Sequence, residues 1–186
     1  MAEFDPAHVA AARYDATSIA FHWITVALIG TLWIVGQTIN DIPRGMWRID
    51  YRSVHFLLGA TLGGVILGRM AWRRWRGDEV PELGGRLAAL AARAVHFALY
   101  ALVLGTVALG VLTALGQGAN VFGLFSLPQL GLHAAAHRLR GLHSLAANAI
   151  LILAGLHAAA ALGHHFVLRD PTLRRMLPAR RRATRA

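Results

Sequence analysis

The chain has 186 residues, of which 56% are hydrophobic and only 15% are charged, with a mean hydropathy of +0.48. A soluble domain is typically about 25% charged, so this composition points away from a water-soluble enzyme or a nucleic-acid-binding domain. The formal net charge is nevertheless +10, and all nineteen basic residues are arginine. Cysteine is absent, which excludes disulfides, thiolate zinc sites, iron–sulfur clusters and thioether-attached haem.

Four apolar runs follow one another along the chain, and each is long enough to cross the hydrocarbon core of a bilayer as a helix. They cover residues 18–37, 53–72, 95–116 and 142–164. The runs do not alternate as the strands of a membrane barrel do, and a backbone in lipid must satisfy its own hydrogen bonds. The sequence therefore predicts an all-α integral membrane protein, a bundle of four transmembrane helices that forms one domain over residues 1–186.

Arginine is distributed unevenly between the segments that connect these helices. Fourteen of the nineteen arginines lie at the two termini, between the second and third helices or at the end of the second helix (Arg69), and five lie on the opposite side. Because positively charged loops tend to stay in the cytoplasm, this bias predicts that both termini are cytoplasmic. We interpret the basic tail, residues 167–186, as a topology signal that also contacts anionic lipid.

Six of the ten histidines lie inside or at the edge of the apolar runs. An imidazole at membrane depth is costly unless it has a partner, so these residues are candidates for function. His143 and His157 are fourteen residues apart, which is close to four helical turns, so they share one face and are separated by about 21 Å along the axis. His55 begins the second helix on the outer side, and His22 lies one turn into the first helix on the inner side.

These depths pair His55 with His143 near the outer surface and His22 with His157 near the inner surface. Two such pairs suit two bis-histidine haems stacked across the bilayer, because haem b needs only axial nitrogens and an apolar slot. His96 on the third helix is the rival of His157 as an inner ligand. A channel or metal transporter is the alternative from another class, but no Asp or Glu lies within a helix core, where ion transport usually needs one.

Several motifs at these positions resemble the bacterial four-helix cytochrome b561 family, and within it the superoxide oxidase branch. The most specific part is the stretch 155–165, GLHAAAALGHH, and the resemblance covers residues 13 to 178. Other matching stretches are Arg13-Tyr14-Asp15, His22-Trp23, Val54-His55, His96 with Tyr100, 143–148 and 170–178. The axial ligands that the resemblance implies are His22 and His157 for the inner haem b, and His55 and His143 for the outer haem b.

His96 and His164 would then line a cavity beside the inner haem, with Ser18 as a weaker neighbour. A quinone has two carbonyl oxygens that need hydrogen-bond donors, and its reduced form must take up protons. Imidazoles supply both, so we expect these residues to bind ubiquinone.

The resemblance implies an oxidoreductase of the bacterial inner membrane that oxidises superoxide on the outer side and reduces ubiquinone on the inner side. Arginines on the outer side would concentrate such an anion by their positive potential. They are Arg44, Arg48, Arg52, Arg138 and Arg140. The alternative is a cytochrome b subunit that carries electrons from a dehydrogenase partner to the quinone pool. The spacing of His133 and His137 also suits surface metal binding, and their role stays open.

Overall fold

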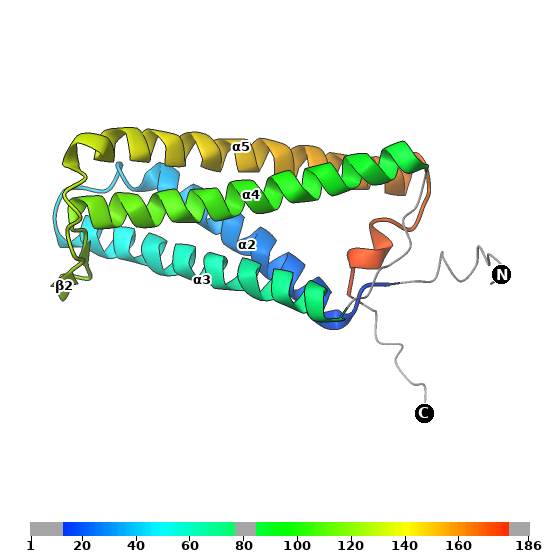
Figure 1. Cartoon of the computed structure of the whole chain (residues 1–186), viewed down its shortest axis with the longest axis horizontal. Coiled ribbons are helices and arrows are strands. Elements are labelled where there is room, and N and C mark those ends of the chain that lie inside the picture. The colour runs from blue at the N-terminus through cyan, green and yellow to red at the C-terminus, as the bar shows by residue number, and fades with distance from the viewer. Residues whose placement is uncertain (1–12, 77–84, 179–186) are drawn as a thin grey trace, which may run out of the picture.

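The computed structural model describes residues 13–76 and 85–178. Four long helices lie side by side: α2 (Ala16–Thr38), α3 (Met46–Arg76), α4 (Arg86–Gln117) and α5 (His133–Phe166) (Figure 1). The other elements of the described residues are two short strands, β1 (Asn120–Val121) and β2 (Phe125–Ser126), and the 3₁₀ helix η1 (Arg174–Met176). All four long helices are apolar and long enough to cross a membrane, which confirms the predicted fold class.

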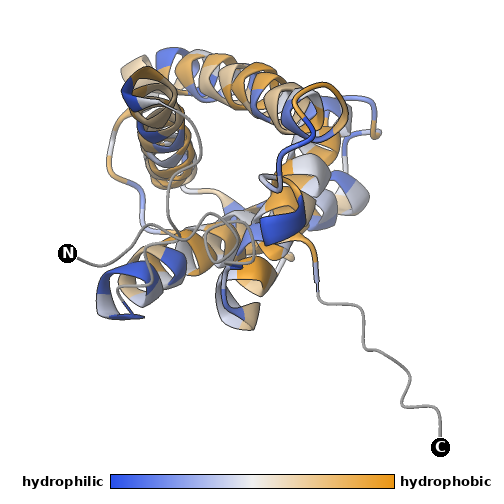
Figure 2. Cartoon of the chain, turned by 90° about the vertical axis from the view of Figure 1, so that its right-hand side faces the viewer, coloured by the Kyte–Doolittle hydropathy of each residue, from blue (hydrophilic) through white to orange (hydrophobic). Residues whose placement is uncertain are grey.

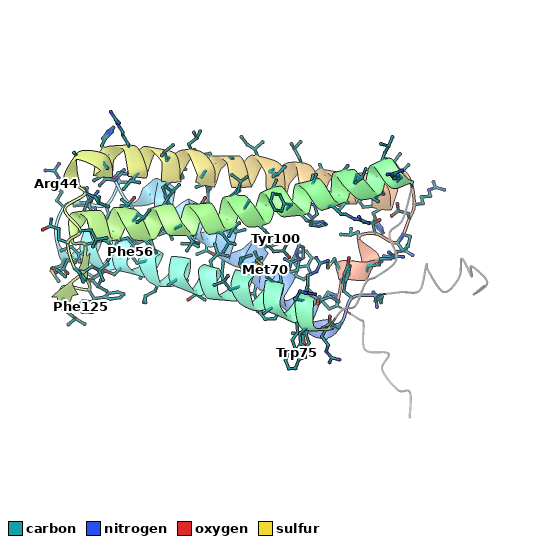
Figure 3. The ribbon with its side chains drawn as sticks, in the orientation of Figure 1. Arg44, Phe56, Met70, Trp75, Tyr100 and Phe125 are labelled. Carbon is teal, nitrogen blue, oxygen red and sulfur yellow. The ribbon has the colours of Figure 1, made fainter. Side chains whose placement is uncertain are left out.

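The two ends of the bundle differ in what they contain. The terminal end holds the starts of α2 and α4 and the ends of α3 and α5, whereas the loop end holds the α2–α3 connection and the β1–β2 hairpin (Figure 1). Arg44 lies at the loop end and Trp75 at the terminal end (Figure 3). At the terminal end, Trp23 donates a hydrogen bond to the carbonyl of Met176, which holds η1 against the start of α2.

The helices are longer than the apolar runs that predicted them. α4 begins at residue 86 rather than 95, and α5 begins at 133 rather than 142. The added turns are rich in Ala, Leu and Arg, which favour helix in any solvent, whereas hydropathy marks only the part that lies in lipid. Of the predicted basic tail, residues 179–186 lie outside the described residues.

A small hairpin between α4 and α5 was not predicted from the sequence. β1 and β2 pair in antiparallel fashion, with Val121 opposite Phe125. The hairpin is attached to α3 through Ser53, which is fully buried: its hydroxyl donates to the carbonyl of Ile49 and accepts from the backbone N–H of Phe122 at 2.8 Å. This contact fixes the loop end against the second membrane helix.

The core is a narrow apolar cluster to which each of the four helices contributes. Its buried members are Leu32, Leu62, Ile66, Val103 and Ile150. Large apolar side chains elsewhere point outward; Phe97, for example, is 75% exposed. Hydrophobic residues recur along the long helices, as the orange segments of Figure 2 show, and many of their side chains are exposed. Such a surface is unstable in water but is the surface that lipid tails require.

Asp15 organises the start of α2. Its side chain accepts from the backbone N–H groups of Thr17 and Ser18 at 3.0 Å, from the Ser18 hydroxyl at 2.5 Å, and from the Trp72 indole at 3.1 Å. Partial burial raises the pKa of Asp15, but the hydrogen bonds from Ser18, Trp72 and Thr17 outweigh it, so the pKa lies below its usual value. The carboxylate therefore caps α2 and ties it to α3.

Replacing Asp15 by Ala should lower the stability of the bundle by about 1 kcal/mol, the usual cost of a lost helix cap. Asp15→Asn, which keeps the cap, should stay close to wild type. Because the pKa of Asp15 is lowered, its contribution is complete at neutral pH and is lost only when the pH falls through that lowered value. Thermal unfolding in detergent, followed by circular dichroism, measures the difference. Equal transition temperatures for wild type and Asp15→Ala would show that the cap is dispensable.

Candidate functional site

One pair of histidines lies toward the loop end, with His55 on α3 and His143 on α5. Their ring centroids are 6.1 Å apart and the ring planes are inclined by 70°. An imidazole nitrogen lies about 2.0 Å from a metal that it binds, so two rings on opposite sides of one ion have centroids about 6 Å apart. The spacing of this pair therefore suits a single iron between the rings.

His143 is held in the tautomer that a metal ligand needs. Its Nδ1 lies 2.9 Å from the carbonyl oxygen of Thr106, which can only accept, so Nδ1 carries the proton. The neutral ring then has its lone pair on Nε2, free to bind a metal. Gly110 on α4 makes room for the ring, because a Cβ there would lie 3.1 Å from His143 Cε1.

His55 is enclosed in a comparable way by α2. A Cβ at Gly36 would lie 3.4 Å from His55 Cε1, so the glycine lets the ring lie against the backbone. The Nδ1 of His55 is buried and has no hydrogen-bond partner within the described part of the chain. A buried polar atom without a partner costs about 1–3 kcal/mol, which is unusual for a histidine whose only role is packing. The spacing of this ring from His143 is compatible with a ligand role.

A second group of histidines lies toward the terminal end. His22 on α2 and His157 on α5 have centroids 6.5 Å apart, and His96 on α4 lies closer to His157, at 5.2 Å. Both pairs have T-shaped geometry, and the wider spacing of His22 and His157 also suits two rings on opposite sides of one metal. The geometry thus accords with His22 and His157 as the inner pair and leaves His96 beside them.

Arg69 on α3 is a functional candidate that sequence reasoning missed, since it was counted only with the arginines that set topology. It is 7% exposed although it lies within a membrane helix. Its guanidinium donates to His22 Nδ1 at 3.2 Å and lies over the ring of Tyr100, 5.7 Å from the centroid. Its position seven residues before the end of α3, between Gly68 and Met70, is the signal that could have revealed it.

His164, predicted to bind quinone, forms a close pair with Asp170. Its Nδ1 lies 2.5 Å from the carboxylate, and the backbone N–H of Asp170 donates to the carbonyl of His164. The chain can fold back in this way because Arg169 adopts a left-handed conformation with φ of +55°, which is strained for a residue other than glycine. Burial raises the pKa of Asp170, but hydrogen bonds from Thr172 and His164 outweigh it and lower the pKa.

Ser18, the weaker quinone candidate, is buried, and its hydroxyl donates to Asp15. Its proton is therefore already used in the cap of α2, and only its oxygen remains to accept a hydrogen bond. His137 is exposed on the first turns of α5. Among the side chains that the structure describes, no group of three His, Cys, Asp or Glu gathers as a metal-ion site.

The predicted anion-attracting arginines are partly brought together at the loop end. Arg44, Arg48 and Arg52 line one pocket of about 260 Å³ with Gly45 and Ile49. Arg52 is also within electrostatic reach of Arg140 on α5. Arg140 in turn donates to the side chain of Gln117, while Arg138 is exposed and does not line this pocket.

Known proteins resemble this chain over nearly its whole length. The family described as prokaryotic cytochrome b561 matches residues 13–179. Cytochrome b561 homolog 2 of Escherichia coli K12 is 33% identical over 171 residues, which are 89% of this chain and 91% of that protein. The chain belongs to the prokaryotic cytochrome b561 family.

Two further relatives of similar length support the assignment. The probable superoxide oxidase CybB of Yersinia pestis is 29% identical over 91% of this chain and 98% of its own length. Cytochrome b562 of Cereibacter sphaeroides is 32% identical over 90% of this chain and 96% of its own length. The protein is therefore a multi-pass electron-transfer cytochrome of the bacterial inner membrane, and its family implies haem b. The imidazole pairs described above fit that group.

Gly110→Ala tests the fit of this cytochrome b561 around His143. The new methyl group would press on the His143 ring and move it away from Thr106, so the haem b content should fall. Gly105→Ala on the same helix is the matched control, because a Cβ there meets nothing within 4 Å. Haem per chain from the pyridine haemochrome spectrum is the measurement. Equal haem content in both variants would mean that the close approach of Gly110 to His143 has no bearing on cofactor binding.

Proposed function

We propose that this cytochrome holds two haems b, oxidises superoxide at its loop end and reduces ubiquinone at its terminal end. The observation that carries the proposal is the presence of two imidazole pairs, each with the spacing of a bis-histidine iron site. His143 and His157 both project from α5 and are separated by fourteen residues, about 21 Å along the helix. When bound, the two haems supply two one-electron carriers, one toward each membrane surface.

The protein between the two pairs is suited to separate them without admitting water. Ile150 lies midway between His143 and His157 in sequence and is 4% exposed. It packs in the apolar cluster with Leu32, Leu62 and Val103. A buried apolar cluster disfavours water and protons at the centre of the bundle, so that only electrons would pass between the two ends.

We propose further that the loop end faces the outside and that both termini lie in the cytoplasm. The support is the arginine bias, because the terminal end carries Arg73, Arg74, Arg76, Arg174 and Arg175 among the described residues. Several more arginines belong to residues 179–186, which lie outside the described residues. In this orientation superoxide formed outside the cell membrane reaches the loop end first.

The loop-end pocket lined by Arg44, Arg48 and Arg52 would attract a small anion. Arg48 is fixed by hydrogen bonds to the carbonyls of Ile42 and Asn40, so the positive charge is held in place. The relative from Yersinia pestis bears the name probable superoxide oxidase, which supports superoxide as the anion. Two superoxide ions would give two molecules of oxygen, and the two electrons with two protons would convert one quinone to one quinol.

At the terminal end, His96 and His164 would donate to the quinone carbonyl oxygens. His164 is 35% exposed and Asp170 is 23% exposed, so this pair can exchange protons with water. The Asp170 carboxylate accepts from the Nδ1–H of His164 and orients the ring, so that the two side chains could together pass a proton to a reduced quinone. Ser18 stays with Asp15 and would only accept a hydrogen bond here.

Stopped-flow mixing with superoxide tests the proposal. Superoxide should reduce the haem on the time scale that stopped-flow mixing resolves, and a ubiquinone analogue should then reoxidise it. Arg52→Gln should slow the reduction several-fold at low salt and flatten its salt dependence, because the anion loses part of its attraction. Arg74→Gln, which removes an exposed charge at the other end of α3, is the control and should leave the rate unchanged.

If superoxide leaves the haem spectrum of the wild-type protein unchanged, the proposed reaction is wrong. An electron-transfer subunit that receives its electrons from a dehydrogenase partner would then be the better account.

A further inference from the structure

We propose that Arg69 is the counter-ion for a haem propionate, and that it raises the reduction potential of the terminal-end haem. This inference depends on the proposed placement of that haem between His22 and His157. The observation behind it is a guanidinium inside a membrane helix, only 7% exposed and surrounded by His22, His96, His157 and Tyr100. The surroundings contain no anion from the described part of the chain.

Each carboxylate in the described part of the chain either accepts hydrogen bonds from other groups or lies far from Arg69. Asp15 accepts from Ser18 and Trp72, and Asp170 is paired with His164. Asp50 lies nineteen residues before Arg69 on α3, about 28 Å along the helix. Asp41 belongs to the connection at the loop end. A buried charge without a partner is one of the most costly arrangements in a protein, especially in a membrane, so Arg69 requires an anion from a bound molecule.

The hydrogen bond from Arg69 to His22 cannot persist when His22 binds iron through Nε2. Arginine only donates, so His22 Nδ1 must accept, and the neutral ring then carries its proton on Nε2. An iron ligand needs the opposite arrangement, with the lone pair on Nε2 and the proton on Nδ1. Iron and Arg69 thus compete for the same imidazole, and ligation releases the guanidinium to another acceptor close by.

A carboxylate is the acceptor that the released group fits best. The Nε of Arg69 is buried and has no hydrogen-bond partner in the described chain, and the same holds for the hydroxyl of Tyr100. A guanidinium edge binds a carboxylate through two parallel N–H bonds, and the tyrosine hydroxyl adds a third donor. Haem b carries two propionates on the edge of its porphyrin ring, and Arg69 and Tyr100 would hold one of them.

The consequence is electrostatic. A fixed positive charge in a medium of low dielectric favours the more electron-rich form of the iron, so Arg69 would make the terminal-end haem easier to reduce. Electrons would then run downhill from the loop-end haem toward the quinone. A quinone oxygen is the other acceptor that Arg69 could hold, and the experiment separates the two.

The test is a spectroelectrochemical titration of Arg69→Gln, with Arg73→Gln as the matched control. Arg73 is exposed and one turn further along α3, so its removal deletes the same charge without deleting the contact. Arg69→Gln should disfavour reduction of the terminal-end haem at least tenfold, which is about 59 mV for one electron. The loop-end haem and the Arg73→Gln protein should shift by less than this, and Arg69→Lys should restore part of the potential.

The same titration in a His143→Ala background assigns the signal. If that variant keeps both haems, the proposed haem placement fails. If it keeps one haem whose potential is unmoved by Arg69→Gln, only the role of Arg69 fails.

An unmoved potential with a raised KM for the quinone analogue would assign Arg69 to quinone and overturn the inference. Loss of the haem from Arg69→Gln but not from Arg69→Lys or Arg73→Gln would support it, and loss from all three would overturn it.

Discussion

The arrangement of this bundle depends on the need of each imidazole inside a membrane for a partner. Lipid offers none, so the chain supplies a backbone carbonyl for His143 and an arginine for His22, whereas the His55 ring lies against Gly36 and its Nδ1 has no partner among the described residues. Each ring is oriented by a neighbouring helix rather than by its own. The partners therefore also fix how the helices pack, and the carbonyl of Thr106 holds His143 in the orientation and tautomer that a haem ligand needs.

The two ends of the bundle are built for different chemistry. The loop end combines a buried histidine pair with a cluster of arginines and a hairpin that Ser53 attaches to α3. The terminal end combines a histidine pair with a buried arginine and the His164–Asp170 pair, which can exchange protons with water. In the proposed function, the apolar cluster between them separates the site that takes electrons from an anion from the site that passes electrons and protons to quinone.

Much of this architecture could be predicted from the sequence, because apolar runs and the fourteen-residue spacing on α5 are properties of single helices. The contacts between helices could not be predicted. The sequence does not indicate the role of Gly110, because that role depends on its contact with the His143 ring of α5. The sequence does not distinguish Arg69 from the arginines that set topology, because the next charges on α3 follow within about one turn. The His164–Asp170 pair depends on the left-handed backbone conformation of Arg169. Arginine rarely adopts this conformation, so the sequence does not predict it.

Quantitative iron and haem analysis of the purified, cofactor-replete protein tests the central claim most directly. Two imidazole pairs predict two irons and two haems b per chain, and a single haem remaining, at the terminal end, after His143→Ala. One haem or fewer in the wild-type protein, or an unchanged content after His143→Ala, would contradict the account of two stacked haems.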